Sequence, residues 1–255
     1  MRDKIIPFST LNILAAMMLF AFPCLADEKG LDIMKQVDSQ SKTYNTQTSE
    51  VFMLITDNKG NHRKRYFTNW KKRYPETVKS LIKFYKPANV KGTSLLTYSH
   101  NDKEDNDQWI FLPALRSIKQ LSSEDKHNGF MGSDFSYSDV AGRQINQDEH
   151  NFIKETDKYY LIRSIPKDNE DPYSMIDLVI KKDIFMPLKI IFYNKKGEKL
   201  KTLVNKKIER HKDTYIAIEA VMENHIKGSN TLLQVSGITL DEKISDNSFG
   251  VKSLQ

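Results

Sequence analysis

The chain has 255 residues, of which 39% are hydrophobic and 28% charged, and its formal net charge is +6. This length is enough for one large all-β domain or two small ones. The basic excess is mainly lysine spread over turns and strand edges, and the lack of a clustered basic stripe argues against nucleic-acid binding. Attraction to an anionic membrane surface or an acidic partner stays open.

The first 26 residues predict a secretory signal peptide. Arg2 and Lys4 precede an apolar run over residues 11–22, and the small Ala26 stands at the expected cleavage point. The apolar run is shorter than the roughly 20 residues that a membrane span needs. We therefore expect an exported chain whose mature part, residues 27–255, is a single domain.

Cys24 is the only cysteine of the chain. It follows the apolar run, as a lipid-modified cysteine would, but Pro23 stands where lipoprotein processing requires a small residue. Cleavage after Ala26 would remove Cys24. The mature chain would then have no disulfide, and its stability would have to come from a hydrophobic core.

The mature chain is predicted to begin with a short amphipathic helix and to continue as strands. Leu31, Met34 and Val37 recur at helical spacing over residues 30–41, and the apolar period changes to two over residues 46–56. Turn-forming residues separate further segments of strand character. Those segments cover about residues 64–74, 79–85, 93–99, 151–155, 159–165, 175–181, 188–193, 199–208, 215–222 and 231–240.

The stretch from residue 107 to 140 is the most informative part of the chain. The apolar run Trp109, Ile110, Phe111 and Leu112 predicts a strand that Pro113 ends. A second strand is predicted around Ile118 and Leu121, because these apolar residues lie at near-alternating spacing.

The following loop, residues 122–138, is polar but contains large apolar residues among glycines and serines. These apolar residues are Phe130, Met131, Phe135 and Tyr137. Such a loop is usually a lid, a plug or a binding loop. The alternative is that these side chains only pack over one end of a β-sheet.

The fold class that these patterns predict is mainly β, with one antiparallel sheet of about ten or more strands curled into an open barrel. Both faces of the predicted sheet carry large apolar side chains. In residues 188–193, Leu188 and Phe192 fall on one face and Ile191 and Tyr193 on the other. We therefore expect one face to pack on helices and the concave side to stay partly apolar.

The sequence shows no catalytic signature. Its six histidines are scattered without the paired spacing of a metal site. The stretch from Gly129 to Ser133 lacks the order of a nucleophile elbow, and no phosphate-binding glycine loop is present. We expect no cofactor, no metal and no enzyme activity, although a hydrolase of amphiphilic esters stays open because triads form from residues distant in sequence.

Four stretches of the chain resemble one known family. The strings WIFLPALR and FMGSDFSYSD, the upstream SLIKFYKPANVKGTSLLTYSH and the ending ISDNSFGVKSL resemble the outer membrane lipoprotein-sorting protein family of the LolA-like superfamily. The resemblance covers most of the mature chain. It implies a half-open β-barrel that a helical or loop lid closes over a hydrophobic cavity.

The resemblance and the apolar pattern together predict the ligand-binding residues. The expected cavity wall and lid comprise Met53, Trp109, Phe111, Leu112, Leu115, Phe130, Met131, Phe135 and Tyr137. Methionine and aromatic side chains suit a carrier because they repack at low cost. Arg116 and Asp134 are the predicted polar gate, which would fasten the lid or meet a lipid headgroup.

The predicted function is that of a periplasmic carrier that shuttles a lipid or a lipoprotein acyl chain toward the outer membrane. The resemblance further implies cooperation with an inner-membrane exporter of the resistance-nodulation-division class. Transient contact with a membrane surface and a monomeric chain are separate expectations. The alternative is a periplasmic sensor of mislocalised lipoproteins that signals to a membrane protein partner.

Overall fold

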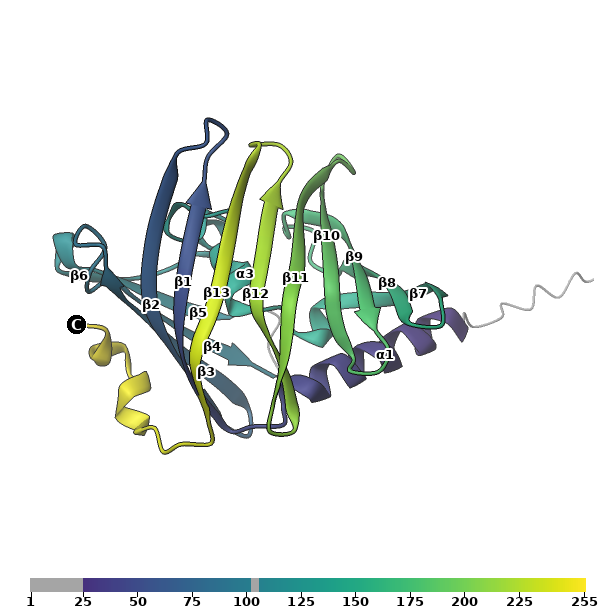
Figure 1. Cartoon of the computed structure of the whole chain (residues 1–255), viewed down its shortest axis with the longest axis horizontal. Coiled ribbons are helices and arrows are strands. Elements are labelled where there is room, and N and C mark those ends of the chain that lie inside the picture. Colours follow the sequence, from purple (N-terminus) through teal and green to yellow (C-terminus); the bar gives the residue numbers. More distant parts are fainter. Residues whose placement is uncertain (1–24, 102–105) are drawn as a thin grey trace, which may run out of the picture.

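The computed structural model describes residues 25–101 and 106–255. Within these residues thirteen strands form one antiparallel sheet (Figure 1). The first six strands are β1 (Thr46–Thr56), β2 (His62–Arg73), β3 (Thr77–Lys86), β4 (Ser94–His100), β5 (Asp107–Leu112) and β6 (Ser117–Gln120). The other seven are β7 (Asp148–Glu155), β8 (Tyr159–Pro166), β9 (Tyr173–Lys181), β10 (Met186–Asn194), β11 (Lys199–His211), β12 (Thr214–Asn224) and β13 (Ser229–Leu240).

Two meanders make up this sheet. Strands β1 to β6 follow one another from the centre to one edge, and β7 to β13 run from the other edge back to the centre. Pairing of β1 with β13 joins the two meanders, with Val51 opposite Val235 and Met53 opposite Leu233. The predicted mainly β, open half-barrel fold is therefore confirmed, and the sheet does not close because β6 and β7 stay unpaired to each other.

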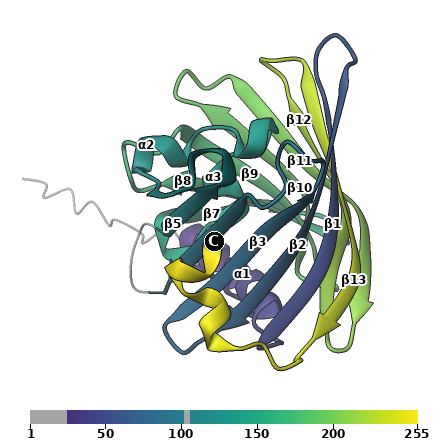
Figure 2. The ribbon, with the colours of Figure 1, turned by 90° about the vertical axis from the view of Figure 1, so that its left-hand side faces the viewer.

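A 27-residue connection from 121 to 147, here called the lid, links the edge strands β6 and β7. It contains the short helices α2 (Ser123–Lys126), η2 (Phe130–Gly132), α3 (Tyr137–Ala141) and η3 (Ile145–Gln147). Capping boxes formed by Ser122 with Asp125 and by Ser136 with Asp139 start α2 and α3. Figure 2 shows both helices on the concave side of the sheet.

Helix α1 (Leu25–Ser41) lies along one end of the strands, beneath β7 to β12 (Figure 1). A Cβ atom at Gly30 would lie 2.2 Å from the carbonyl oxygen of His150, so the close approach of α1 to β7 requires glycine there. Ile33, Met34 and Val37 pack into the apolar cluster formed by the second meander. The helix thus covers one end of the half-barrel.

The predicted signal peptide and Cys24 lie outside the described residues, except for Leu25 and Ala26 in the first turn of α1. Across residues 25–101 and 106–255, no helix combines the length and apolar character needed to cross a membrane.

The outer face of β3 to β5 is covered by the C-terminal segment, helices η4 (Asp246–Phe249) and η5 (Val251–Leu254). Phe249 and Leu254 are almost fully buried against Leu81 and Leu96. The Tyr98 hydroxyl donates to the Phe249 carbonyl oxygen, and Ser94 Oγ donates to that of Leu254 at 2.8 Å. The sequence predicted helices on one face of the sheet only. The structure has η4 and η5 on the outer face, and α1 and the lid helices on the inner side.

Candidate functional site

Two hollows lie between the inner face of the sheet, the lid and α1. The first hollow, of about 530 Å³, lies under β1 to β4 and the paired strands β12 and β13. The second, of about 310 Å³, lies under β8 to β12 and beside α1. Both volumes fall in the range of small-molecule sites, roughly 300 to 1,000 Å³. Phe135, Asp139 and the lid segment 142–144 line both hollows.

The wall of the first hollow changes from apolar to polar along the strands. At the end away from α1 it consists of Val51, Met53 and Phe67. Toward α1, the inward positions of β2 become Asn69, Lys71 and Arg73. The alternation of β-strand side chains places all these residues on one face of the sheet. The hollow therefore has an apolar deep end and a polar end beside α1.

The second hollow has a mainly apolar wall. Its sheet side is formed by Ile176, Leu178, Ile190, Phe192, Leu203 and Met222. Met34 and Val37 of α1 complete it from the opposite side. The apolar stripe of α1 thus faces this hollow through Met34 and Val37.

The lid contributes aromatic side chains to the interior. Phe130 is 2% exposed, and its ring centroid lies 5.6 Å from that of Phe84 and 5.5 Å from that of Tyr137. Met131 adopts a left-handed backbone with φ of 50°, which turns the chain so that Phe130 enters the core. The lid thus fills part of the interior and leaves the two hollows beside it.

A buried ion pair fastens α3 of the lid to β11. Lys201 and Asp139 have side chains only 5% and 8% exposed, and the Lys201 ammonium contacts the Asp139 carboxylate. The Tyr173 hydroxyl donates to the same carboxylate at 2.9 Å. Burial first, and the Asp139 charge second, raise the pKa of Tyr173 well above its usual value. The hydroxyl therefore stays a donor that holds the lid.

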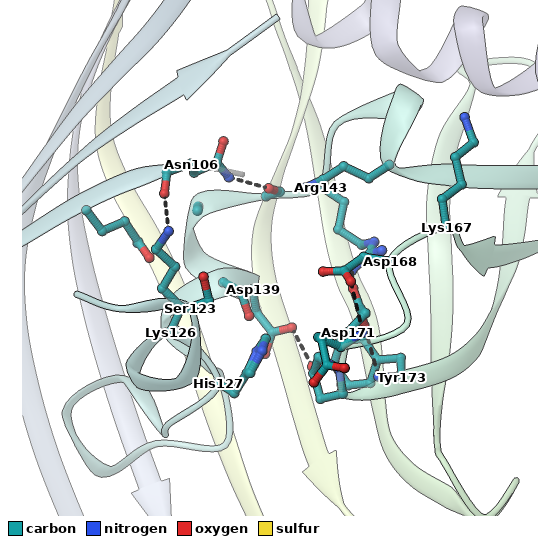
Figure 3. Close-up of a pocket in the computed structure, with 17 residues that line it drawn as sticks. Asn106, Ser123, Lys126, His127, Asp139, Arg143, Lys167, Asp168, Asp171 and Tyr173 are labelled. Carbon is teal, nitrogen blue, oxygen red and sulfur yellow. Dashed lines mark hydrogen bonds and ion pairs between the residues drawn. The ribbon is translucent and has the colours of Figure 1, made fainter. Parts of the chain in front are cut away.

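A second polar cluster fastens the end of the lid to the loop between β8 and β9 (Figure 3). Arg143 donates to Asp148 and, through Nη1 at 2.7 Å, to Asp171. Burial alone would lower the pKa of Arg143, but the two carboxylates raise it above its usual value. The cluster borders a hollow of about 210 Å³ that is lined by α2, α3 and the loop between β8 and β9. Because Arg143 of the lid pairs with two carboxylates from other elements, we interpret the cluster as a clasp that holds the end of the lid.

The predicted polar gate does not form as a pair. Asp134 accepts from Ser229 Oγ at 2.5 Å and from Thr231 Oγ1 at 2.7 Å, so it fastens the lid to β13. Arg116 lies exposed after helix η1 (Pro113–Leu115), with φ of 48° and no ion pair within the described residues. The hypothesis that Arg116 holds the lid through Asp134 is therefore wrong, because β13 supplies the partners.

The predicted apolar residues divide into three groups. Met53, Phe130 and Phe135 line a hollow. Leu112, Met131 and Tyr137 pack on the core cluster behind the first hollow. Trp109, Phe111 and Leu115 do not reach the interior. Whether the first group binds a ligand stays a prediction.

Strand alternation explains the misplaced residues. In β5, Gln108 and Ile110 point inward, so Trp109 and Phe111 point outward and pack in the cluster that contains Phe249. Leu115 follows Pro113 in η1 and is 68% exposed. The sequence could not show this, because both faces of β5 carry large apolar side chains.

Other wall residues were missed by the sequence analysis. Leu233 and Val235 of β13 line the first hollow opposite the lid, and Lys71 and Arg73 line its polar end. The alternation of Phe67, Asn69, Lys71 and Arg73 along β2 was the available signal for a shared inward face. Among the residues that the structure describes, no group of three histidine, cysteine or acidic side chains is arranged to hold a metal ion.

Comparison with known proteins places this geometry in a family. A family model whose description reads "Uncharacterized protein" matches residues 76–255. No curated protein matches the chain.

Several solved structures are similar over most of their length. A putative outer membrane lipoprotein-sorting protein domain from Vibrio parahaemolyticus is 28% identical, with a TM-score of 0.85 over 89% of this chain and 99% of that one. A DUF1329 family protein from Desulfovibrio piger is 26% identical, with a TM-score of 0.85 over 90% and 99%. A LolA superfamily protein from Nitrosomonas europaea shares the fold, at 18% identity and a TM-score of 0.69 over 87% and 97%. The chain therefore belongs to the family that the matching model describes, and its fold is similar to that of the outer membrane lipoprotein-sorting domain and of the LolA superfamily protein.

Proposed function

We propose that the protein is a periplasmic carrier that shelters the acyl chain of a lipid or of a lipid-modified protein in its two hollows. The observation that carries this proposal is the unfilled interior: about 530 and 310 Å³ remain beside the lid, under walls rich in apolar side chains. A chain that needed only a stable core would fill this space, because protein interiors are close-packed.

The energetics favour such a load. Withdrawing an acyl chain from water is worth roughly 0.8 kcal/mol per methylene, so a chain of about sixteen carbons gains on the order of 12 kcal/mol. A carrier must also release its load. Polar contacts at Asp134, Asp139 and Arg143 hold the lid, and such contacts can be exchanged for water more readily than a packed apolar core.

The similarity to the lipoprotein-sorting domain from Vibrio parahaemolyticus supports the same proposal and, with the predicted signal peptide, a periplasmic location. Transport then needs no covalent chemistry, since entry and exit of an acyl chain change only its surroundings. The inner-membrane exporter stays a prediction from the family resemblance.

Native mass spectrometry of the protein purified from periplasm tests the proposal. We expect an amphiphile at about one per chain, identified after solvent extraction, and displacement of a fluorescent fatty-acid probe by that extract. Protein unfolded in urea and refolded without lipid is the control, and it should take up the probe again. A chain that is reproducibly empty and that also refuses the probe would contradict the carrier function.

A further inference from the structure

The polar end of the first hollow carries an unbalanced positive charge. Six charged side chains line this hollow: Asp38, Lys42, Lys71, Asp139, Arg143 and Arg73. Four of them are paired within the protein. Asp38 contacts Lys42 at 2.5 Å, Asp139 contacts Lys201, and Arg143 contacts Asp148 and Asp171. Lys71 and Arg73 remain, with no ion pair in the part of the chain that the structure describes.

These two cations are held at a defined place. Arg73 Nη2 donates to the carbonyl oxygen of Ser41 at the end of α1, at 2.7 Å, which anchors the guanidinium beside the helix. Its Nε is buried without a hydrogen-bond partner. Oδ1 of Asn69, which lies two residues before Lys71 on β2, is also buried without a partner. Lys71 Nζ lies 5.9 Å from the ring centroid of Tyr44. Arg73 is therefore fixed beside α1 at the place where it lines the hollow.

The apolar deep end lies a short way along the same strand. Phe67 is four residues from Lys71 on β2, a separation of roughly 13 Å at the usual rise per residue. Val51, opposite Phe67 on β1, and Met53 continue the apolar wall. A molecule lying along β2 would thus place one end among cations and the other among apolar side chains.

We infer that Lys71 and Arg73 form a headgroup site for an anionic amphiphile, one with a phosphate or carboxylate group at the end of its acyl chain. The inference rests on the proposed carrier function and narrows its cargo. An arginine guanidinium and a lysine ammonium match anionic oxygens, and both side chains line the same end of the hollow. A neutral headgroup would leave both cations uncompensated.

Binding of three single-chain amphiphiles with equal alkyl length tests the site. Dodecyl phosphate, dodecanoate and the neutral dodecyl maltoside are titrated below their micelle concentrations, with displacement of an uncharged fluorescent alkyl probe as readout. We expect the better of the two anionic ligands to bind at least about tenfold more tightly than the neutral one. The order of phosphate and carboxylate then tells a phospholipid-type headgroup from a fatty acid.

Variants separate the headgroup site from the hollow itself. Lys71→Gln alone, and together with Arg73→Gln, should weaken binding of the anionic ligands far more than binding of dodecyl maltoside and so remove the preference for anions, whereas Lys71→Arg should keep the preference. Lys64→Gln is the control, because Lys64 has the same charge on the same strand but is exposed on the outward side. Circular dichroism confirms folding of each variant.

The outcomes are distinguishable. Equal binding of anionic and neutral ligands by the wild type, or an anion preference that survives in both glutamine variants, would overturn the headgroup site and leave the carrier function intact. Failure of all three ligands to displace the probe, together with failure of the probe to bind, would overturn the carrier function and the headgroup site with it.

Discussion

The two faces of strands β3 to β5 are covered in different ways. On the outer face, Phe249 and Leu254 of the C-terminal segment fill the space over Leu81 and Leu96, and all four side chains are at most 6% exposed. On the inner face the lid covers the same strands and leaves a hollow of about 530 Å³. Apolar character alone therefore does not mark a binding surface. The inner face differs because the lid that covers it leaves an unfilled hollow against the strands.

The covers also differ in how they are attached. The C-terminal segment is held by buried apolar side chains, with hydrogen bonds from Tyr98 and Ser94 to its backbone. The lid is held by the buried rings of Phe130 and Phe135 and, unlike the outer cover, also by charged groups at Asp134, Asp139 and Arg143. We expect the outer cover to behave as core and the inner cover as a part that can move.

Removal of the buried carboxylate of Asp139 should have the largest effect. Asp139→Ala leaves the Lys201 ammonium buried without its partner, so the free energy of unfolding should fall by about 3 to 5 kcal/mol in urea denaturation. Asp183→Ala is the matched control, because its contact with Lys181 is at 3.1 Å between partly exposed side chains. That variant should stay within about 0.5 kcal/mol of the wild type. Equal losses in both variants would show that the buried pair does not hold the lid.

The same enlargement on the two faces should give different results. Leu96→Phe adds volume to the filled outer cluster and should cost about 1 to 3 kcal/mol of stability, with alkyl-probe binding unchanged. Val235→Phe adds volume where it lines the first hollow, so it should cost less than about 1 kcal/mol and should weaken probe binding. The reverse pattern, with binding lost only in Leu96→Phe, would place the binding surface on the outer face.

Acidification should loosen the end of the lid through His150. Burial first lowers the pKa of His150, Lys167 and Arg143 lower it further, and the Ile145 carbonyl and Asp148 oppose the shift. Because the folded pKa lies below that of the unfolded chain, about 6.5, stability is full above pH 6.5 and falls as the pH decreases through the folded pKa.

Replacement of this histidine tests the pH effect. The ring bridges the Ile145 carbonyl of η3 at 2.9 Å and Ser164 Oγ at 2.8 Å. His150→Gln keeps a donor and an acceptor without titrating, so its unfolding free energy should depend less on pH between 7 and 5 than that of the wild type. Identical pH profiles from chemical denaturation would exclude this histidine as the cause.

The smallest effect is expected at Arg116. Its side chain is exposed and makes no ion pair within the described residues, so Arg116→Ala should change stability by less than about 0.5 kcal/mol and should leave probe binding unaltered. Arg116→Gly should be slightly more stable than the alanine variant, since φ is 48°. A clear loss of probe binding in the alanine variant would show that Arg116 contributes to ligand binding.

Local pattern was sufficient to predict most of the fold. The period-two run of β1 was predicted with its observed bounds, and the turn residues separated the later strands correctly. The join between β1 and β13 was not predicted, because residues 46–56 and 229–240 are far apart and either could have been an edge. The start of α1 was placed five residues late, since only its later turns carry the apolar stripe.

The site was less accessible to sequence reasoning. Phe130 and Phe135 were chosen because glycine-flanked aromatic residues in a polar loop need a place to be buried, and both line the first hollow. The contact of Asp139 with Lys201 joins residues 62 positions apart, and that of Asp134 with Thr231 joins residues 97 apart. Such pairs leave no local pattern, so only the three-dimensional arrangement reveals how the lid is held.

Photolabelling with a fatty acid that carries a diazirine in its alkyl chain tests the central claim most directly. The claim is that the space beneath the lid, and not the apolar outer face, receives an acyl chain. Peptide mapping should place the label on residues that line the hollows, above all Val51, Met53, Phe130, Phe135 and Val235. Labelling confined to the outer cluster, at Trp109, Phe111 or the C-terminal segment 246–254, would contradict it.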